Sequence, residues 1–188
     1  QPQTHAKIKE FEGFTFVRLP VPRYRDAHDP RRVVNWFLFT ARLAGLRRLL
    51  PQDRPDAILV SSPSPVAFLG AEWLARRLGA RLVFEVRDIW PLTLIELGGH
   101  APRHPLIRLL RRIERRAYRN ADLVISNLPG ALDHMRADGV TADRFRWIPN
   151  GISAAETAGV TSDPPQLPKR RFLIGYAGTH GHANALDT

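Results

Sequence analysis

Cysteine is absent from this sequence of 188 residues. Without it, the chain can form neither a disulfide framework nor a thiolate metal site. Long apolar runs are absent too. The longest apolar stretch, around residues 33–44, contains Asn35 and Arg42, whereas a helix that spans a bilayer needs about 20 apolar residues. The first residues do not show the charged and apolar segments of a signal peptide. We therefore expect a cytoplasmic protein, and we also consider peripheral attachment to the inner face of the cytoplasmic membrane.

Acidic residues are few, with 18 against 28 basic ones, and the formal net charge is +10. Such a balance favours anionic partners, namely phosphorylated ligands, anionic lipid or nucleic acid. The competing interpretation is a solvated, arginine-rich surface, because the arginines are spread along the chain. We find no helix-turn-helix signature, no zinc module and no aromatic platform among the basic residues, so we expect no nucleic-acid partner. A non-catalytic domain that binds an anionic ligand remains the alternative in another functional class.

Short apolar runs alternate with amphipathic stretches along the chain. The apolar runs predict strands over residues 14–19, 57–61, 82–86, 123–126 and 145–148. The amphipathic stretches predict helices over residues 30–50, 65–78, 105–119 and 129–137, with a short helix after Pro91. The strand at 57–61 is almost continuously apolar, as are strands that are buried on both faces. The alternation predicts an α/β domain with a doubly wound, Rossmann-like parallel sheet.

The composition changes after the turn at residues 149–151. Residues 152–171 contain Pro164, Pro165 and Pro168 among serine, threonine and aspartate, which is typical of a linker. Residues 172–177 are again strand-like. We therefore predict a first domain over residues 1–151, a linker over 152–171 and the start of a second α/β domain over 172–188.

Ligands of open parallel sheets bind outside the carboxyl ends of the strands, so polar residues at these ends are candidates for a site. Ser62 and Ser64 follow the strand at 57–61, and their hydroxyls suit sugar or phosphate oxygens. Arg87 and Asp88 follow the strand at 82–86: the guanidinium suits phosphate, and the carboxylate suits a hydroxyl or acts as a base. Trp90 is suited to stacking on a sugar. The alternatives are an ordinary turn with a helix cap, an ion pair of Arg87 with Asp88 or Glu85, and a tryptophan that is merely packed.

A glycine-containing turn, GYAGTHGHA, follows the strand at 172–177. Gly178 and Gly181 would let backbone N–H groups approach phosphate at a helix N-terminus. The turn does not match the G-x-G-x-x-G fingerprint, so a nicotinamide cofactor is poorly supported. His180 and His182 have no third ligand at a suitable spacing, and we predict no metal site.

The predicted helix at 105–119 is strongly basic. Leu106, Leu109, Leu110, Ile113 and Ala117 lie along one face, and arginines lie largely along the other. Such a helix can lie on anionic lipid. The alternative is a packed helix with one solvated side.

Four segments occur in order: RDIWP at 87–91, ERRAYRNADLVISN at 114–127, RWIPNGI at 146–152 and YAGTHG at 176–181. Together they resemble the retaining glycosyltransferases of family 4, which have the two-domain GT-B architecture. RD-x-WP followed by Glu96-Leu97-Gly98 resembles the bacterial transferases that build O-antigen, capsule or other envelope polysaccharides. The resemblance extends from about Asp56 to the end of the chain, and residues 11–54 fit only loosely.

The resemblance implies that the chain is the N-terminal half of a GT-B enzyme, which transfers a hexose from a nucleotide-diphosphate sugar to a saccharide or lipid-linked acceptor with retention. It implies no cofactor and no bound metal. It assigns Arg87 and Asp88 to catalysis, and it assigns Ser62, Ser64, Trp90 and Glu96 to the acceptor. Donor phosphate would lie at Gly178, Thr179, His180 and Gly181, and the hinge would be Asn150 with Gly151.

Two positions depart from the family pattern. Arg87 stands where many members have histidine, and Ser153 stands where an aspartate is usual. The paired glutamates that contact the donor in the family are not found up to Thr188, so we expect the chain to be incomplete at both ends and inactive alone. A sugar-nucleotide epimerase of the same architecture remains a second enzymatic alternative.

Overall fold

The computed structural model describes residues 6–25, 29–48 and 54–154, together with residues 158, 172, 175, 176 and 178. Residue contacts divide the chain into two units, Gln1–Pro149 and Asn150–Thr188. The elements described below all belong to the first unit. The predicted linker lies largely outside the described residues, and so does most of the predicted strand at 172–177.

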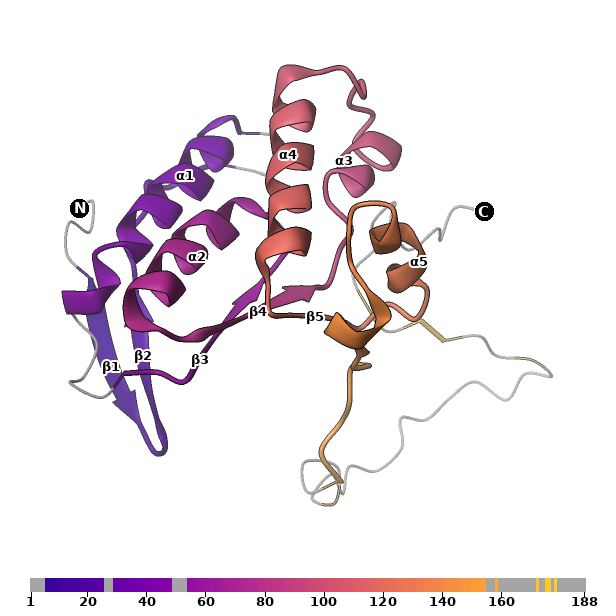
Figure 1. Ribbon diagram of the computed structural model, residues 1–188. Helices are drawn as coiled ribbons and strands as arrows, with labels where there is room; N and C mark the ends of the chain where they lie inside the picture. Colours follow the sequence, from indigo (N-terminus) through magenta and orange to yellow (C-terminus); the bar gives the residue numbers. More distant parts are fainter. Residues whose placement is uncertain are drawn as a thin grey trace. The chain divides into compact units, whose positions relative to one another are not determined.

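A four-stranded parallel sheet forms the centre of the first unit (Figure 1). Its strands follow the order β3 (Ala57–Ser61), β4 (Arg81–Val86), β5 (Leu123–Ser126) and β6 (Phe145–Trp147). Between them the chain forms α2 (Val66–Leu78), α3 (Leu92–Glu96), α4 (Pro105–Asn120), α5 (Ala131–Arg136) and the 3-10 turn η2 (Ala142–Arg144). The predicted Rossmann-like α/β fold is thereby confirmed, and β3 and β5 have the predicted bounds.

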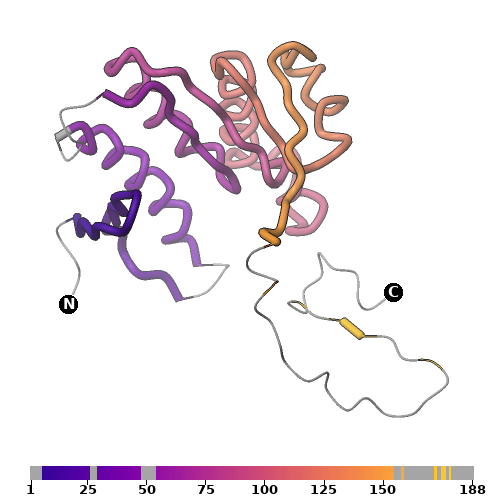
Figure 2. The backbone as a smooth tube through the Cα atoms, turned by 90° about the horizontal axis from the view of Figure 1, so that it is seen from below, coloured from indigo at the N-terminus to yellow at the C-terminus, as the bar shows by residue number. Residues whose placement is uncertain are grey.

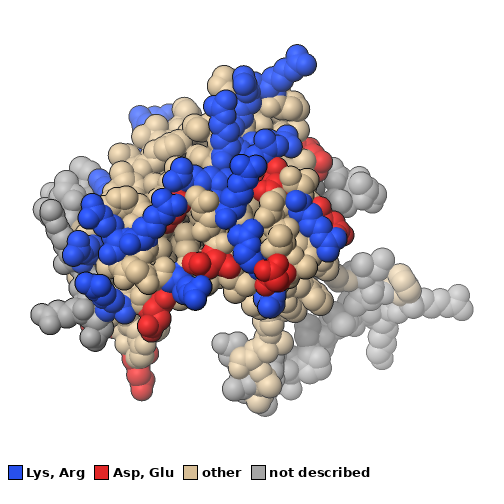
Figure 3. Space-filling model, in the orientation of Figure 1, with Lys and Arg blue, Asp and Glu red and all other residues tan. Residues whose placement is uncertain are grey.

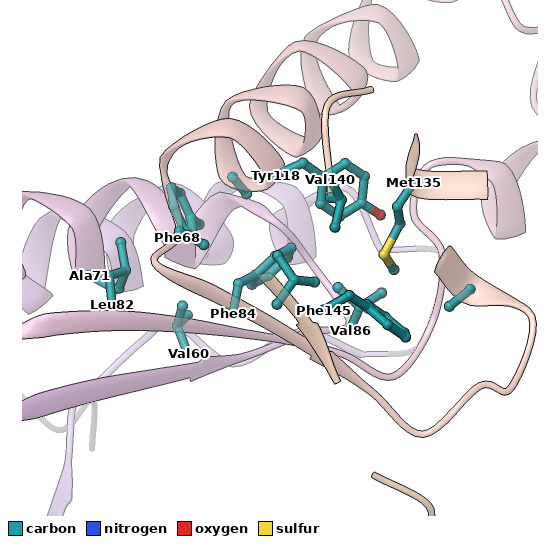
Figure 4. Packing of buried hydrophobic residues seen from close by; sticks show 14 of the residues in the cluster. Val60, Phe68, Ala71, Leu82, Phe84, Val86, Tyr118, Met135, Val140 and Phe145 are labelled. Carbon is teal, nitrogen blue, oxygen red and sulfur yellow. The ribbon is translucent and has the colours of Figure 1, made fainter. Parts of the chain in front are cut away.

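One face of the sheet carries the main hydrophobic core. The strand register places Val60, Phe84, Val124 and Phe145 opposite one another in a row across the four strands, and all four are buried. The helices close over this row, as Figure 4 shows for Phe68 and Tyr118 above Phe84. The rings of Phe68 and Phe84 meet edge to face with centroids 5.4 Å apart. Aromatic packing of this kind adds to the stability gained by burial alone.

The opposite face of the sheet differs from the expectation for β3. Leu59 is 59% exposed, and Ala57 and Ser61 are exposed as well. Within the described part of the chain, β3 is an edge strand, and α2 packs on the face that bears Val60. The prediction that β3 is buried on both faces is therefore wrong for these residues.

A buried carboxylate joins α2 to α4. Glu72 on α2 is 3% exposed and accepts hydrogen bonds from Arg76 at 2.6 Å, Arg116 at 2.7 Å and Asn120 at 2.6 Å. Charged donors of this kind offset the loss of solvation of a buried carboxylate. Because Arg116 and Asn120 belong to α4, Glu72 sets how the two helices lie against each other.

The helix α1 (Arg31–Leu43) packs on α2, and the 3-10 turn η1 (Leu46–Arg48) follows it. At the start of the helix, the Asp29 carboxylate accepts from the backbone N–H of Arg31 at 2.9 Å. Hydrogen bonds from the backbone of Arg25 and Arg31 hold the pKa of Asp29 below its usual value. The helix ends earlier than predicted, since regular α-helix stops at Leu43 just before Gly45.

A two-stranded antiparallel hairpin precedes α1. It consists of β1 (Lys7–Phe11) and β2 (Phe14–Arg18), and Gly13 makes the turn with φ +86°. Only the second strand was predicted, because the charged sequence KIKEF of β1 lacks an apolar run. In both general views the hairpin lies on the side of the unit away from β6 (Figures 1 and 2). None of the helices in the described ranges is long and apolar enough to cross a bilayer.

Candidate functional site

A cavity of about 370 Å³ lies at the carboxyl ends of β3, β4 and β5. Its lining residues are Ser62, Pro63, Arg87, Asp88 and Asn127. Because the three strands are parallel and adjacent, the residues that follow them meet at one edge of the sheet. The structure therefore brings together Ser62, Arg87 and Asp88, which were predicted separately from two strand ends.

Ser62 connects the ends of β3 and β4. Its side chain is buried, and its Oγ accepts from the backbone N–H of Arg87 at 2.8 Å and, more weakly, of Asp88 at 3.4 Å. Its own N–H donates to the Glu85 carbonyl at 2.9 Å. These bonds place the two charged residues at the mouth of the cavity. Ser62 thus contacts the protein backbone. This contact corresponds to the role in an ordinary turn, which was the alternative to ligand binding.

Arg87 and Asp88 are both exposed. Within the described ranges, no ion pair links Arg87 to Asp88 or to Glu85. The alternative of an internal ion pair that holds the loop therefore finds no support here. A guanidinium and a carboxylate at one cavity can bind a ligand that carries both a negative charge and a hydroxyl.

Asn127 is a lining residue that the sequence reasoning missed. Its carbonyl accepts from the Trp147 indole N–H at 3.2 Å, which ties the end of β5 to β6. Its side-chain Oδ1 is buried and has no hydrogen-bond partner among the described residues. A buried amide oxygen without a partner costs roughly 1–3 kcal/mol, so a ligand hydroxyl that reached it would be bound favourably. Asn127 directly follows Ser126, the last residue of a parallel strand, and the strand-end criterion could have found it.

Three predicted acceptor residues do not line this cavity. Trp90 is 7% exposed, and its ring packs with Val66, Leu110 and Ile113 and edge-on against Trp36 at 5.2 Å. Stacking of Trp90 on a sugar does not fit this structure, because the ring is occupied by the core. Glu96 is exposed at the end of α3. Ser64 accepts from the Val66 N–H at 3.3 Å at the start of α2.

A second pocket, of about 330 Å³, also borders the loop that carries Ser62. It shares Pro63 with the cavity and is otherwise mainly apolar. Its lining residues are Val21, Tyr24, Arg32, Asn35, Trp36, Phe39, Ser61, Pro63, Ser64 and Ala67. Sequence reasoning did not single out the aromatic residues among them, because they come from two segments that only the tertiary fold brings to β3.

The predicted donor residues belong to the second unit. Gly178 is described and exposed, whereas Thr179, His180 and Gly181 lie outside the described residues. The predicted hinge residues Asn150 and Gly151 are exposed, and the division between the two units falls just before Asn150. In the part of the chain that the structure describes, no group of three or more histidine, aspartate or glutamate side chains could hold a metal. The roles of all these residues stay predictions.

A parallel α/β domain with a polar cavity at the carboxyl ends of its strands has the arrangement in which open sheets bind ligands. The family model of the Glycosyl transferase 4-like domain matches residues 2–151. The chain belongs to this family, and its first unit is a glycosyltransferase domain. The match includes the segment before Asp56, which the sequence motifs did not cover. A search among curated proteins finds no match.

Proposed function

We propose that the protein transfers a sugar from a nucleotide-diphosphate sugar to a saccharide or lipid-linked acceptor, with retention at the anomeric carbon, in the synthesis of a cell-envelope polysaccharide. The observation that carries the proposal is the cavity at three strand ends in a glycosyltransferase domain, lined by Arg87, Asp88 and Asn127. The lining offers hydrogen-bond donors, a carboxylate and an amide, which together match a polyhydroxylated ligand.

Each charged residue has a separate task in this proposal. Asp88 accepts a hydrogen bond from a hydroxyl of the reacting sugar or its acceptor, and Arg87 stabilises the negative charge that develops on the departing diphosphate. Ser62 acts on both through their backbone N–H groups, so it is a positioning residue. Gly178, Thr179, His180 and Gly181 supply backbone donors to the donor diphosphate. Arg87 offsets part of the phosphate charge, and the proposal requires no metal.

The first test is an assay of the natural full-length protein with a panel of nucleotide sugars and a lipid-linked saccharide acceptor. We expect one donor to be consumed and its sugar to appear on the acceptor with unchanged anomeric configuration. An epimerase would instead convert the nucleotide sugar in the absence of any acceptor. A folded protein that neither hydrolyses nor transfers any donor would contradict the proposal.

The second test is Asp88→Asn, which removes the carboxylate and keeps the size of the side chain. We expect turnover to fall by about 10²–10⁴-fold, the usual contribution of a positioned acid or base, while circular dichroism shows an unchanged fold. Asp133→Asn is the matched control, because Asp133 is exposed on α5 and does not line the cavity. Near-normal turnover in Asp88→Asn would remove Asp88 from the mechanism.

A further inference from the structure

Residues of one short loop line both the polar cavity and the apolar pocket. Ser62 lines the cavity, Ser61 and Ser64 line the pocket, and Pro63 lines both. The two spaces therefore adjoin at Pro63. A single ligand that fills both must have a polar end beside Arg87 and Asp88 and an apolar part beyond Pro63.

The walls of the pocket are aromatic. Tyr24, Trp36 and Phe39 line it, and Tyr24 and Phe39 remain 48% and 38% exposed. Arg32 is the one charged residue among the lining residues. A volume of about 330 Å³ with mainly apolar walls and few polar groups is typical of a site for a small molecule. It equals the space of roughly eleven water molecules at about 30 Å³ each.

The pocket is built by specific contacts. Asn35 on α1 is 6% exposed, and its Nδ2 donates to the Pro22 carbonyl at 2.7 Å. This bond holds the segment 19–25 beside α1, as the tube in Figure 2 shows. Trp36 is supported from behind by the edge-on contact with the buried Trp90. Trp36 and the segment 19–25 are thus held in place by the protein before any ligand enters, which lowers the entropic cost of binding.

We propose that this pocket holds the apolar chain of the acceptor, so that the acceptor is an amphiphile whose saccharide end enters the polar cavity. The inference rests on the proposed function, because it takes the polar cavity as the place of transfer. Arg32, which also lines the pocket, supplies a positive charge to an anionic group of such an acceptor. Trp36, Phe39 and Tyr24 then determine specificity for the acceptor by contact with its apolar part.

The test uses n-alkyl phosphates of four, six, eight and ten carbons as probes, each below its aggregation concentration, with inorganic phosphate as the reference. Binding to the full-length protein is followed by tryptophan fluorescence and by calorimetry, without a nucleotide sugar. Each buried methylene adds roughly fourfold in affinity, and we expect this gain to level off once the pocket is full. A constant affinity along the series would overturn the proposal. An increase in affinity without a plateau would assign the patch to a membrane and would overturn the proposal as well.

Two variants and one matched control locate the binding. Phe39→Ala and Tyr24→Ala should each weaken octyl phosphate binding by about tenfold. Tyr24 lies outside helices and strands, so that its truncation leaves the fold intact. Phe37→Ala is the control, because Phe37 lies on the same helix, is also 38% exposed and does not line the pocket. We expect it to bind octyl phosphate within twofold of the parent protein, and an equal loss in Phe37→Ala and Phe39→Ala would overturn the assignment.

The test of the pocket assignment and the test of the proposed function can fail independently of each other. A protein that binds the alkyl chain at Phe39 but transfers no sugar contradicts the proposed function alone. A protein that transfers sugar to acceptors with and without a chain, and is indifferent to Phe39→Ala, overturns the pocket assignment alone.

Discussion

Glu114 on α4 is a buried carboxylic acid outside the candidate site. It is 4% exposed, and the Tyr118 hydroxyl donates to its Oε1 at 3.0 Å. Loss of solvation raises the pKa of Glu114 to about 7, with a smaller contribution from the Asp138 carboxylate, while Tyr118, Arg111 and Arg115 act in the opposite direction. Burial and the neighbouring Glu114 also raise the pKa of Tyr118. The cluster therefore makes stability depend on pH near neutrality.

The direction of this pH dependence follows from the protonation of Glu114 in the folded and in the unfolded chain. The folded carboxyl keeps its proton up to about pH 7, whereas an unfolded glutamate releases it near pH 4.3. The free energy of unfolding should then fall as pH rises through this interval, by on the order of 3 kcal/mol. Glu114→Gln should flatten the profile and be more stable than the parent protein at pH 8. Urea unfolding at pH 5 and pH 8 measures this, with Glu12→Gln in the exposed hairpin turn as the control. Parallel profiles for the parent protein and Glu114→Gln would show that Glu114 is not responsible.

Single residues also show which site positions could be predicted from the sequence and which could not. Arg87 and Asp88 were found because they follow a recognisable strand, and strand ends share one edge of the sheet. Trp90 was misassigned, because the sequence does not show that Val66 and Leu110 lie against its ring. In the basic helix, Leu109 was assigned to the apolar face but is 40% exposed, and the burial of Glu114 was not predicted. Burial of such residues depends on which neighbouring helix or strand packs against each face of their own element.

At the scale of elements, the contact of α1 with α2 depends on Gly70. A Cβ at this position would lie 2.6 Å from the Thr40 carbonyl and 3.1 Å from the Leu43 side chain. The Thr40 hydroxyl donates in the same region to the Val66 carbonyl at 3.1 Å. Glycine in a helix normally costs about 1 kcal/mol relative to alanine, so the close approach of the two helices is the reason for its presence here.

Gly70→Ala tests this account. The added methyl group meets backbone, which cannot move without displacing α1, and overpacking of this kind costs about 1–3 kcal/mol. We expect the free energy of unfolding to decrease even though alanine is the better helix former. Gly130→Ala is the control, since nothing lies within 4 Å of a Cβ at Gly130. Thermal or urea unfolding distinguishes the outcomes, and a Gly70→Ala protein as stable as its parent would mean that α1 is not closely held.

Over the molecule as a whole, positive charge gathers along α4. Figure 3 shows Lys and Arg side chains over this helix. Its exposed arginines are Arg108, Arg111, Arg112, Arg115, Arg116 and Arg119. Arg115 pairs with Asp138 at 2.7 Å and Arg116 with Glu72 at 2.7 Å. Arg108 and Arg112 have no acidic partner within the described ranges. Together with Leu109, which is 40% exposed, they form a surface suited to anionic lipid.

We predict that the full-length protein sediments with vesicles that contain phosphatidylserine and that salt weakens this binding. Each basic residue near such a surface contributes about 1 kcal/mol. The double variant Arg108→Glu with Arg112→Glu should therefore reduce vesicle binding by at least tenfold. Lys7→Glu with Lys9→Glu changes the net charge equally on the hairpin and serves as the control. An equal loss in both variants would show that net charge alone, and not the surface of α4, attracts the protein to lipid.

Local patterns in the sequence were sufficient to predict the alternation of strands and helices and the edge of the sheet at which polar residues gather. These follow from local periodicity and from the geometry of parallel strands. The tertiary structure alone decided that Asn127 joins Arg87 and Asp88, that Trp90 is buried, and that residues of α1 and of segment 19–25 enclose an apolar pocket next to β3. Those results depend on contacts between segments distant in the chain, and no local pattern of residues encodes which of these segments will meet.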